Sequence, residues 1–359
     1  MKILHIITSL RTGGAEKLMV EILPRFKERG IVADLLLFDG SPTPFRKELE
    51  SEGIRIFDFG IGGNVYNPKH ILKLRKIMRE YDIIHTHNTA PQFFAAIARS
   101  NSSKLVTTEH GGSNRRRKYG IFRKIDKMMY DRYNHIICIS DQAEINLKGF
   151  VGGTKAHISI VYNGVDVQRC ANALPFEEMR QNLPAGGKAI LMVAGFRWEK
   201  DQDTVIKSIP LLPNNFHLFF AGDGVRRTEC EQLSKTLRVD DRVHFLGMCT
   251  NIPNLLKASD YIVLSSHFEG LSLSSVEGMS VGKPFIASDV DGLREVVKGY
   301  GILFPHQDSE ALANEILRLD ADKKLYEEIA SQCGKRAREF DISKMTEGYI
   351  EIYNKLISK

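Results

Sequence analysis

The stretch from residue 259 to residue 299 constrains the fold of this chain more than any other. Its apolar run at 261–264 predicts a buried β-strand, residues 270–281 have the spacing of a helix, and a second strand is predicted at 284–287. Two such strands joined by a helix form a right-handed crossover in a parallel sheet. Ligands of these sheets bind beyond the carboxyl ends of the strands, and Glu269 stands at the end of the first strand.

The same alternation of strand and helix runs through the rest of the chain. Before residue 166 it predicts strands at 2–8, 32–38, 54–57, 82–85, 104–108, 135–139 and 158–161. It restarts near residue 188 with strands predicted at 189–194, 216–221 and 242–246. The fold class is therefore α/β, with mostly parallel sheets covered by helices on both faces. A chain of 359 residues is long enough for two domains, which we place at 1–166 and 167–342, followed by an amphipathic helix at 343–357.

Two carboxylates in the stretch 259–299 indicate binding of hydroxyl groups. Glu269 precedes the predicted helix and Glu277 lies in its second turn. An ionised carboxylate accepts two hydroxyl donors in charge-assisted hydrogen bonds, so each glutamate can hold one pair of sugar or ribose hydroxyls. The same helix start offers the free backbone N–H groups of Gly270, Leu271 and Ser272 to an anion or a sugar oxygen. The alternative is that Glu269 only complements the positive end of the helix and that Glu277 lies on a solvated face.

The block as a whole is more specific than either glutamate. Ser-His-Phe-Glu-Gly-Leu-Ser-Leu-Ser-Ser-Val-Glu-Gly-Met, followed by Gly-Lys-Pro-Phe-Ile-Ala and Gly-Leu-Arg-Glu-Val-Val, resembles the E-x7-E signature of the retaining glycosyltransferase family 4. The resemblance implies the GT-B fold, in which two Rossmann-like domains face each other across a cleft and the last helix crosses back to the first domain. It also implies that Glu269 contacts hydroxyls of the donor sugar and that Glu277 holds the ribose. Gly278 stands where the family more often has alanine.

Two further segments resemble the elements of that family that bind the diphosphate. Gly13 and Gly14 follow the first strand in a Gly-Gly-Ala-Glu sequence similar to the family's N-terminal loop, and glycine lets the backbone approach a ligand closely. Lys200 and Arg197 are the cations expected to face the diphosphate leaving group. The usual arginine position of the family is occupied by Gly195, and Arg197 comes two residues later. A lysine at a helix start is electrostatically unfavourable without an anion, which favours a functional role for Lys200.

Three histidines stand at or near the ends of predicted strands. His110, in Val-Thr-Thr-Glu-His-Gly-Gly, resembles the family histidine that touches the donor hexose, and a plain turn histidine is the alternative. His85 and His87 form an H-x-H pair of the kind that can bind zinc, but no acid or cysteine stands at ligand spacing. We therefore interpret the pair as hydrogen-bonded at the edge of the sheet. D-x-D motifs, which bind a metal and a diphosphate in the other large glycosyltransferase fold, occur three times and do not discriminate. We expect neither a metal nor another cofactor.

The basic charge is concentrated in the first half of the chain. Residues 1–166 hold 26 Lys and Arg against 17 Asp and Glu, and the run 115–127 contains seven basic residues against Asp126 alone. Interleaved apolar residues make this run amphipathic, which is typical of a helix resting on an anionic membrane surface. A solvated basic helix that binds nothing explains the run equally well. The sequence contains no recognised nucleic-acid-reading module, so nucleic acid is not an expected partner.

Cysteine usage and hydropathy indicate the compartment. The five cysteines are widely spaced and form no C-x-x-C pair, which favours reduced thiols over a disulfide framework. The sequence shows neither a signal-peptide pattern nor an apolar run of bilayer length. We expect a cytoplasmic protein that is peripheral on the inner face of the membrane if the basic run binds lipid.

These patterns predict a retaining glycosyltransferase. It would move a hexose from a nucleotide-diphosphate sugar, with a UDP-sugar favoured, to a saccharide or lipid-linked saccharide acceptor in surface polysaccharide biosynthesis. One alternative is a GT-B nucleotide-sugar epimerase or hydrolase, which would turn over without an acceptor. Another is a non-catalytic sugar-nucleotide-binding partner, against which the presence of all the candidate site residues counts.

Overall fold

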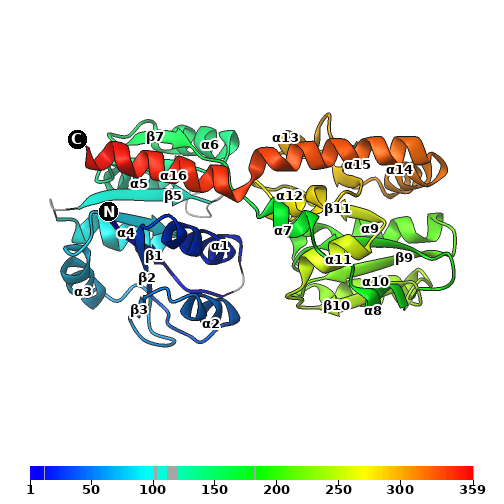
Figure 1. Ribbon diagram of the computed structural model, residues 1–359, viewed down its shortest axis with the longest axis horizontal. Helices are drawn as coiled ribbons and strands as arrows, with labels where there is room; N and C mark the ends of the chain where they lie inside the picture. Colours follow the sequence, from blue (N-terminus) through cyan, green and yellow to red (C-terminus); the bar gives the residue numbers. More distant parts are fainter. Residues whose placement is uncertain (12, 101–102, 111–119, 182, 359) are drawn as a thin grey trace. The chain divides into compact units, whose positions relative to one another are not determined.

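A computed structural model of the protein describes residues 1–11, 13–100, 103–110, 120–181 and 183–358. The chain divides into two compact units (Figure 1). Unit 1 comprises Met1–Gly164 and Ile342–Lys359, and unit 2 comprises Val165–Asp341. The chain thus leaves unit 1 two residues before the predicted boundary at 166, and its last helix returns to unit 1. That the domains face each other across a cleft stays a prediction.

Unit 1 is built on a sheet of parallel strands. Within the described residues, the strand order is β3-β2-β1-β4-β5-β6-β7. The strands are β1 (Lys2–Ile7), β2 (Val32–Leu37), β3 (Ile56–Asp58), β4 (Ile83–His87), β5 (Lys104–Glu109), β6 (His135–Cys138) and β7 (His157–Ile160). The chain order reverses between β1 and β4, and the ends of the strands beside such a reversal are where ligands bind in open α/β sheets.

Helices cover both faces of this sheet because its strands are apolar on both sides. Ile3 and Ile7 of β1 belong to one buried cluster, with α1, α2 and α16, whereas Leu4 and Ile6 belong to a second cluster with α3, α4, α5 and α6. Figure 1 shows α16 in red lying along unit 1 beside segments from the first half of the chain. The helices are α1 (Gly14–Glu28), α2 (Pro44–Ser51), α3 (Lys69–Met78), α4 (Thr89–Ala98), α5 (Gly120–Tyr130), α6 (Asp141–Val151) and α16 (Ile342–Ile357).

Unit 2 repeats the architecture with the strand order β10-β9-β8-β11-β12-β13. Its strands are β8 (Lys188–Val193), β9 (Phe216–Ala221), β10 (Val243–Gly247), β11 (Tyr261–Leu264), β12 (Phe285–Ser288) and β13 (Ile302–Phe304). Its α-helices are α7 (Val167–Ala171), α8 (Glu177–Gln181), α9 (Gln202–Ser208), α10 (Arg227–Thr236), α11 (Ile252–Ala258), α12 (Leu273–Ser280), α13 (Leu293–Val297), α14 (Ser309–Ala321) and α15 (Lys323–Ala337). Short 3-10 helices lie at η2 (Trp198–Lys200), η3 (Ile209–Leu211) and η4 (Arg338–Phe340). Here the strand order reverses between β8 and β11.

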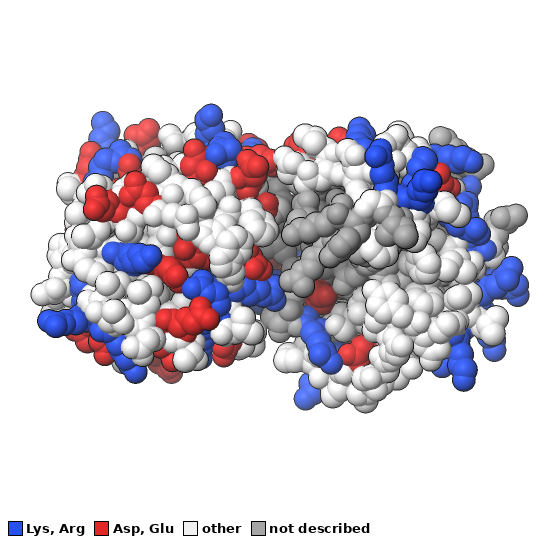
Figure 2. Space-filling model, turned by 180° about the vertical axis from the view of Figure 1, so that it is seen from behind, with Lys and Arg blue, Asp and Glu red and all other residues white. Residues whose placement is uncertain are grey.

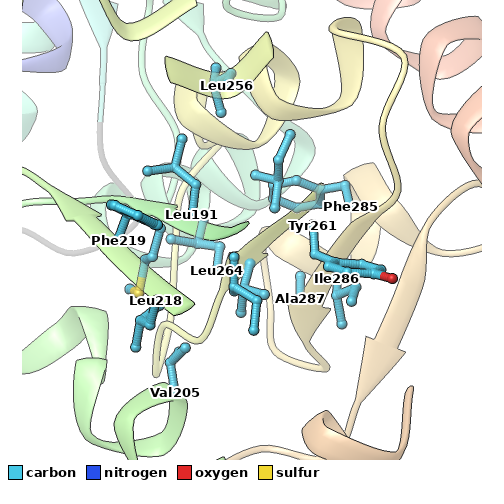
Figure 3. Close-up of a cluster of buried hydrophobic side chains, with 14 of the residues drawn as sticks. Leu191, Val205, Leu218, Phe219, Leu256, Tyr261, Leu264, Phe285, Ile286 and Ala287 are labelled. Carbon is cyan, nitrogen blue, oxygen red and sulfur yellow. The ribbon is translucent and has the colours of Figure 1, made fainter. Parts of the chain in front are cut away.

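The core of unit 2 explains why its central strands are continuously apolar. Leu191, Phe219, Tyr261 and Phe285, from four neighbouring strands, are at most 2% exposed. Figure 3 shows these side chains directed into one buried cluster with the aliphatic residues around them. Full burial of a side chain of this size contributes about 1.5–3 kcal/mol. A parallel strand covered on both faces is therefore apolar at most of its positions.

The predicted parallel α/β sheets are confirmed, one predicted helix boundary is corrected, and one strand was missed. The helix predicted at 270–281 begins only at Leu273, because Ser272 has extended backbone angles (φ −74°, ψ 113°) that no helical residue adopts. Strand β13 was not predicted, since its three residues carry too little pattern. The five cysteines are free, and four of them are buried. Among the helices of the described residues, none is both long and apolar enough to cross a membrane.

Candidate functional site

Two of the predicted site residues of unit 2 are in direct contact. Lys200 ends η2, which follows β8, and Glu269 lies in the loop after β11. The Lys200 Nζ atom and the Glu269 Oε1 atom are 2.5 Å apart, and the Ser266 hydroxyl donates to the same carboxylate oxygen at 2.6 Å. The side chains of the pair are only 21% and 10% exposed. The structure therefore places a cation and a carboxylate together beside the reversal of strand order.

Hydrogen bonds between the two loops hold this pair in place. Ser265 Oγ donates to the carbonyl oxygens of Lys200 and Asp201 at 3.2 and 2.6 Å, and the His267 N–H donates to the Glu199 carbonyl at 2.8 Å. Because β8 and β11 are neighbours in the sheet, loops that are far apart in the sequence leave the same edge side by side. The contact between Lys200 and Glu269 follows from this pairing.

The loop that carries Glu269 also contacts a glycine from the segment after β12. The Glu269 N–H donates to the Asp291 carbonyl at 3.2 Å. Gly292 has φ +82°, and a Cβ atom there would lie 2.3 Å from the Gly270 carbonyl oxygen and 2.4 Å from that of Glu269. Only glycine fits this position without moving the Glu269 loop.

The backbone donors predicted at Gly270, Leu271 and Ser272 precede helix α12 instead of forming its first turn. Among the described residues, none of their N–H groups has a hydrogen-bond acceptor. The first N–H groups of α12, at Leu273 and Ser274, have no partner within the helix either. Five consecutive backbone donors therefore follow Glu269. Such a row suits an anion or several sugar oxygens.

Glu277 lies in the second turn of α12, as predicted, but not on a solvated face. It is only 6% exposed. Ionised carboxylates are rarely buried unless they are paired. Burial removes the alternative interpretation of Glu277 as a surface residue and leaves it as a carboxylate held at a defined position.

Arg197 is the most exposed of the charged site residues predicted in unit 2. Its side chain is 65% exposed, and its guanidinium lies 4.0 Å from the Glu199 carboxylate. A Cβ atom built at Gly195 would lie 3.9 Å from the Arg197 Nε atom and no closer than 3.4 Å to any other atom. The guanidinium of Arg197 therefore lies near the space that a side chain at position 195 would enter.

In unit 1, Gly13 and Gly14 lie where β1 passes into α1. A Cβ atom at Gly13 would be 2.2 Å from a carboxylate oxygen of Glu16, whereas one at Gly14 would meet nothing within 4 Å. Glu16 in turn lies 3.4 Å from the side-chain nitrogen of Asn88, which follows β4. Burial raises the pKa of Glu16 above its ordinary value. This cluster occupies the reversal point of the sheet in unit 1, between β1 and β4.

His110 follows β5 and contacts His87. The His110 Nε2 and His87 Nδ1 atoms are 2.8 Å apart, and burial lowers the pKa of His110 to about 4. His85 and His87 do lie on one side of β4 as predicted, with ring centroids 4.4 Å apart. They are not at the sheet edge, however, because β4 is an inner strand and both residues are fully buried.

Sequence reasoning gave no role to His5, Glu16, Asn88 or Ser266. Ser266 and Asn88 carry no sequence signal beyond standing after a predicted strand. His5 did carry one, since a histidine inside the apolar run Ile3–Ile7 must be buried and needs partners. Glu16 was visible in the Gly-Gly-Ala-Glu sequence, but only the fold brings it to Asn88.

The three D-x-D sequences are occupied by structural contacts. Their carboxylates pair with, accept from or cap neighbouring groups: Asp201 with the Thr204 hydroxyl, Asp203 with Arg226, Asp289 and Asp291 with Arg294, Asp320 with Lys188, and Asp322 with the first turn of α15. Two sets of described residues bring possible metal-binding atoms within 4.8 Å of one another, namely His5, His85 and His87, and Asp201, His267 and His306. The expected lack of a metal requirement stays a prediction.

The arrangement in unit 2 can bind a polar ligand of mixed character. The Lys200 ammonium suits an anionic group, the Glu269 and Glu277 carboxylates accept from hydroxyls, and the row of backbone donors serves further oxygens. Unit 1 offers the exposed backbone at Gly14 and the ring of His110. The roles that we assign to these residues stay predictions.

Comparison with known proteins identifies the family. The family model described as "Glycosyltransferase Family 4" matches residues 12–169, and that described as "Glycosyl transferases group 1" matches residues 175–340. The lipopolysaccharide core biosynthesis glycosyltransferase LpsD of Rhizobium meliloti is 27% identical over 369 residues, covering 100% of both chains. An Escherichia coli enzyme named UDP-Gal:alpha-D-GlcNAc-diphosphoundecaprenol alpha-1,3-galactosyltransferase is 26% identical over 283 residues, covering 73% of this chain and 72% of its own.

A solved structure confirms the fold. Anabaena HepE in complex with UDP-glucose superimposes with a TM-score of 0.84 at 24% identity, covering 99% of this chain and 100% of HepE. The two parallel sheets with their helices are thus the GT-B fold. The two family models together span most of the sequence, and the relatives are named glycosyltransferases. This chain is a glycosyltransferase and belongs to glycosyltransferase family 4.

Proposed function

We propose that this protein is a retaining glycosyltransferase that moves a hexose from a UDP-sugar to a saccharide or lipid-linked saccharide acceptor in surface polysaccharide biosynthesis. The E. coli relative is named for a UDP-Gal donor and a diphosphoundecaprenol-linked acceptor. The HepE structure contains UDP-glucose, and LpsD is named for lipopolysaccharide core biosynthesis. These names support the donor class and the acceptor class.

The observation that carries the proposal is the contact between Lys200 and Glu269, followed by five consecutive backbone donors. In the proposed complex Lys200 binds the diphosphate, and Arg197 adds a second cation from the same loop. Glu269 accepts from hydroxyls of the hexose, and Glu277 accepts from the ribose. The N–H groups from Gly270 onward donate to oxygens of the sugar or the phosphates.

Unit 1 supplies the remaining groups in this proposal. His110 holds the hexose, and the backbone at Gly13 and Gly14 donates to the diphosphate. The reaction is a front-face displacement in which the acceptor hydroxyl attacks the anomeric carbon while the bond to phosphate breaks. The departing phosphate oxygen accepts the proton of the acceptor hydroxyl. Lys200 and Arg197 stabilise the negative charge that grows on that phosphate, so no enzyme nucleophile is required.

Thermal unfolding with a panel of nucleotides tests the donor class. UDP, GDP and ADP, each alone and as sugar conjugates, would be compared with and without EDTA. A ligand that binds only the folded state at 100 times its Kd stabilises it by about 2.7 kcal/mol, which raises Tm by about 5–10 °C. We expect this shift with UDP and its sugars and no effect of EDTA. A shift with GDP or ADP alone, or a shift that EDTA abolishes, contradicts the proposal.

Product analysis tests the reaction. With UDP-hexoses and a lipid diphosphate saccharide, the product should keep the anomeric configuration of the donor, as judged by NMR of the new linkage. Inversion would contradict the retaining mechanism. Equal release of UDP with and without an acceptor would instead identify a nucleotide-sugar hydrolase.

We also propose that the basic run at 115–127 places the enzyme on an anionic membrane surface. Residues 115–119 lie outside the described residues, and α5 carries the rest of the run. Ile125 and Met128, three residues apart on this helix, are 38% and 71% exposed beside exposed Arg123 and Lys124. On unit 1 (right in Figure 2), Lys and Arg side chains gather along the outer rim of the visible face. Apolar side chains next to cations suit the interface of an anionic bilayer.

Flotation with vesicles tests the membrane proposal. We expect the protein to float with vesicles rich in anionic lipid, and Met128→Asp or Lys124→Glu to weaken flotation several-fold. Leu174→Asp in unit 2 is a matched control, because Leu174 is 76% exposed and no Lys or Arg stands within four residues of it in the sequence. Equal flotation of all variants, or no flotation of the unaltered protein, would contradict the proposal.

A further inference from the structure

A row of hydrogen-bonded histidine rings lies behind His110 in the core of unit 1. His110 Nε2 is 2.8 Å from His87 Nδ1, and His87 Nε2 is 3.0 Å from His5 Nδ1. His5 and His87 are 0% exposed. The three residues come from β1, β4 and the end of β5, which are adjacent in the sheet. We call this row the histidine chain.

The two ends of the histidine chain differ. At the buried end, His5 Nε2 has no hydrogen-bond partner among the described residues. At the other end, His110 is only partly buried, and no described residue bonds to its Nδ1 atom. The histidine chain therefore connects His5 Nε2, which has no partner among the described residues, to His110 Nδ1, to which no described residue bonds.

The contacts of these rings oppose an interpretation as a metal site. His5, His85 and His87 bring nitrogen atoms within 4.8 Å of one another. Both nitrogens of His87 are already engaged in the histidine chain. Those of His85 lie 2.5 Å from the Tyr353 hydroxyl and 2.7 Å from the Thr108 hydroxyl. A cation would have to replace several of these hydrogen bonds, and no carboxylate or thiolate in the group would offset the cost of burying its charge.

At neutral pH each ring in the chain carries one proton. Burial lowers the pKa of His5 to about 3 and that of His110 to about 4, and it lowers the pKa of His87 well below the ordinary value. Each contact between two neutral rings needs one N–H donor and one bare nitrogen. Only two arrangements of the protons satisfy both contacts, because the nitrogen that is protonated on one ring determines which nitrogen must be protonated on the next.

The orphaned nitrogen of His5 distinguishes the two arrangements. In the first, His5 Nε2 carries the proton, so a buried N–H group has no acceptor, and His110 Nδ1 is bare. In the second, His5 Nε2 is bare, and the Nδ1–H of His5 donates to His87 Nε2. The Nδ1–H of His87 then donates to His110 Nε2, so His110 carries its proton on Nδ1. Among backbone groups, buried N–H donors without an acceptor are rarer than under-satisfied carbonyl acceptors, and we apply the same preference to the buried ring of His5. The second arrangement is therefore favoured.

We propose that His5 and His87 are positioning residues that fix the tautomer of His110, so that its Nδ1–H donates a hydrogen bond to an oxygen of the bound substrate. That His110 faces the hexose rests on the function proposed above. A protonated Nδ1 atom cannot accept a proton, so His110 recognises an oxygen as a neutral donor and does not serve as a general base at that atom. This assignment agrees with a reaction in which the departing phosphate takes the proton.

Nitrogen NMR of histidine-labelled protein tests the tautomer directly, without any substrate. The His110 signals are identified by their loss in His110→Gln. At pH 7 we expect His110 to carry its proton on Nδ1 and to have a bare Nε2. A His110 ring protonated on Nε2, or a doubly protonated ring, would overturn the proposal. Because this measurement uses the unaltered protein, it decides the matter even if a variant fails to fold.

Two variants of His87 test the positioning role. His87→Leu removes the donor to His110, and we expect the His110 proton to move to Nε2 in a substantial fraction of molecules. His87→Asn places an amide N–H close to where the Nδ1–H lay, and the original tautomer should persist. An unchanged tautomer in His87→Leu would overturn the role of the chain. The His217 and His244 rings, 3.1 Å apart in unit 2, serve as reference signals that neither variant should alter.

Kinetics separate this inference from the proposed function. His87→Leu should lower kcat/KM for the donor by about tenfold, mostly through KM, because a net loss of about 1.4 kcal/mol corresponds to a factor of ten. His87→Asn should recover most of that loss, whereas equal activity of His87→Leu and the unaltered enzyme would contradict the inference. A protein with the expected tautomer but without transferase activity would refute the proposed function and support the positioning role.

Discussion

At the residue scale, the paired charges of Lys200 and Glu269 matter most. Each is more buried than a typical surface ion pair, and Ser266 adds a hydrogen bond to the same carboxylate oxygen. Removing one partner leaves the other charge poorly solvated, which costs more than an exposed pair would. The pair therefore holds both side chains in position for a ligand that can replace the mutual contact.

Substitution of the two glutamates should separate chemistry from nucleotide binding. Glu269→Ala removes the proposed acceptor for the hexose hydroxyls and the partner of Lys200, so we expect kcat to fall by at least about 100-fold. Glu277→Ala should mainly raise the Kd for UDP, by about 10-fold or more, since a hydrogen bond to a charged group is worth about 1.5–3 kcal/mol. Steady-state kinetics and calorimetric titration of UDP measure the two effects.

Glu269→Gln is the control that keeps the size of the side chain and changes only its charge. It keeps an oxygen that can accept from Ser266 but removes the charge, and it should retain the fold with a large loss of kcat. An active Glu269→Ala enzyme would show that the hexose is held elsewhere.

Arg197 stands two residues after the position at which the family resemblance expects an arginine, and this difference leads to a second prediction at the residue scale. Arg197→Gly should weaken UDP binding by about 10-fold through loss of a charge-assisted contact to phosphate. The double variant Gly195→Arg/Arg197→Gly returns the arginine to its usual position in the family. Because a Cβ at position 195 makes only ordinary contacts, the side chain should be accommodated and binding largely restored. Isothermal titration with UDP measures both. Undiminished binding by Arg197→Gly would exclude Arg197 from the diphosphate site.

At the element scale, helix α12 packs closely on the strands that flank it. A Cβ atom at Gly278 would lie 2.8 Å from the ring of Phe285 and 3.0 Å from a methyl of Ile262. The resemblance to the family implies alanine more often at this position, and the size of the side chain at position 285 limits the space for the extra methyl group. Because Glu277 precedes Gly278, the approach of the helix to the sheet also sets the position of a site carboxylate.

A double-mutant cycle tests this coupling. Gly278→Ala should destabilise the protein by about 1–2 kcal/mol, because overpacking outweighs the gain of about 1 kcal/mol from alanine in a helix. In a Phe285→Leu background the same substitution should be neutral or stabilising, since the ring that blocks the Cβ is gone. Unfolding in urea gives both free energies. The same cost in the two backgrounds would show that Phe285 does not limit the packing of α12.

At the scale of the whole molecule, each unit has its own core, but unit 1 is completed only by the last helix. Tyr349 and Tyr353 of α16 are fully buried in unit 1, and their hydroxyls reach Thr108 and His85. Unit 2, in contrast, is one continuous segment, Val165–Asp341. Unit 1 therefore cannot be complete until helix α16 has been synthesised.

Because each unit has its own core, we expect a core substitution to destabilise only the unit that carries it. Leu191→Ala in the core of unit 2 should lower its stability by about 2–5 kcal/mol, and Tyr349→Ala should do the same for unit 1. Native-state hydrogen exchange should show lower protection only in the unit that carries the substitution. Equal loss of protection in both units after either change would mean that they unfold as a single cooperative body.

The pattern of the sequence was sufficient for most of the elements and for the family. The mostly apolar runs at 261–264 and 216–221 coincide with β11 and β9, because parallel strands buried on both faces are apolar at most positions. The start of α12 was placed three residues too early, although Ser272, a residue type favoured at helix N-caps, stands directly before Leu273. The short β13 was missed for want of pattern.

The sequence determined the features that depend on residues close together in the chain, and the tertiary structure decided the contacts between residues far apart in it. Periodicity and the block around Glu269 depend on neighbours in the chain, and they indicated the α/β fold and the candidate residues. The contact of Lys200 with Glu269, 69 residues apart, depends on the pairing of β8 with β11. The histidine chain likewise brings residues 5, 87 and 110 together because β1, β4 and β5 are adjacent in the sheet. The same strands and helices could have formed a sheet with another strand order. Strand order is chosen by the packing of the whole domain, and local pattern does not encode it.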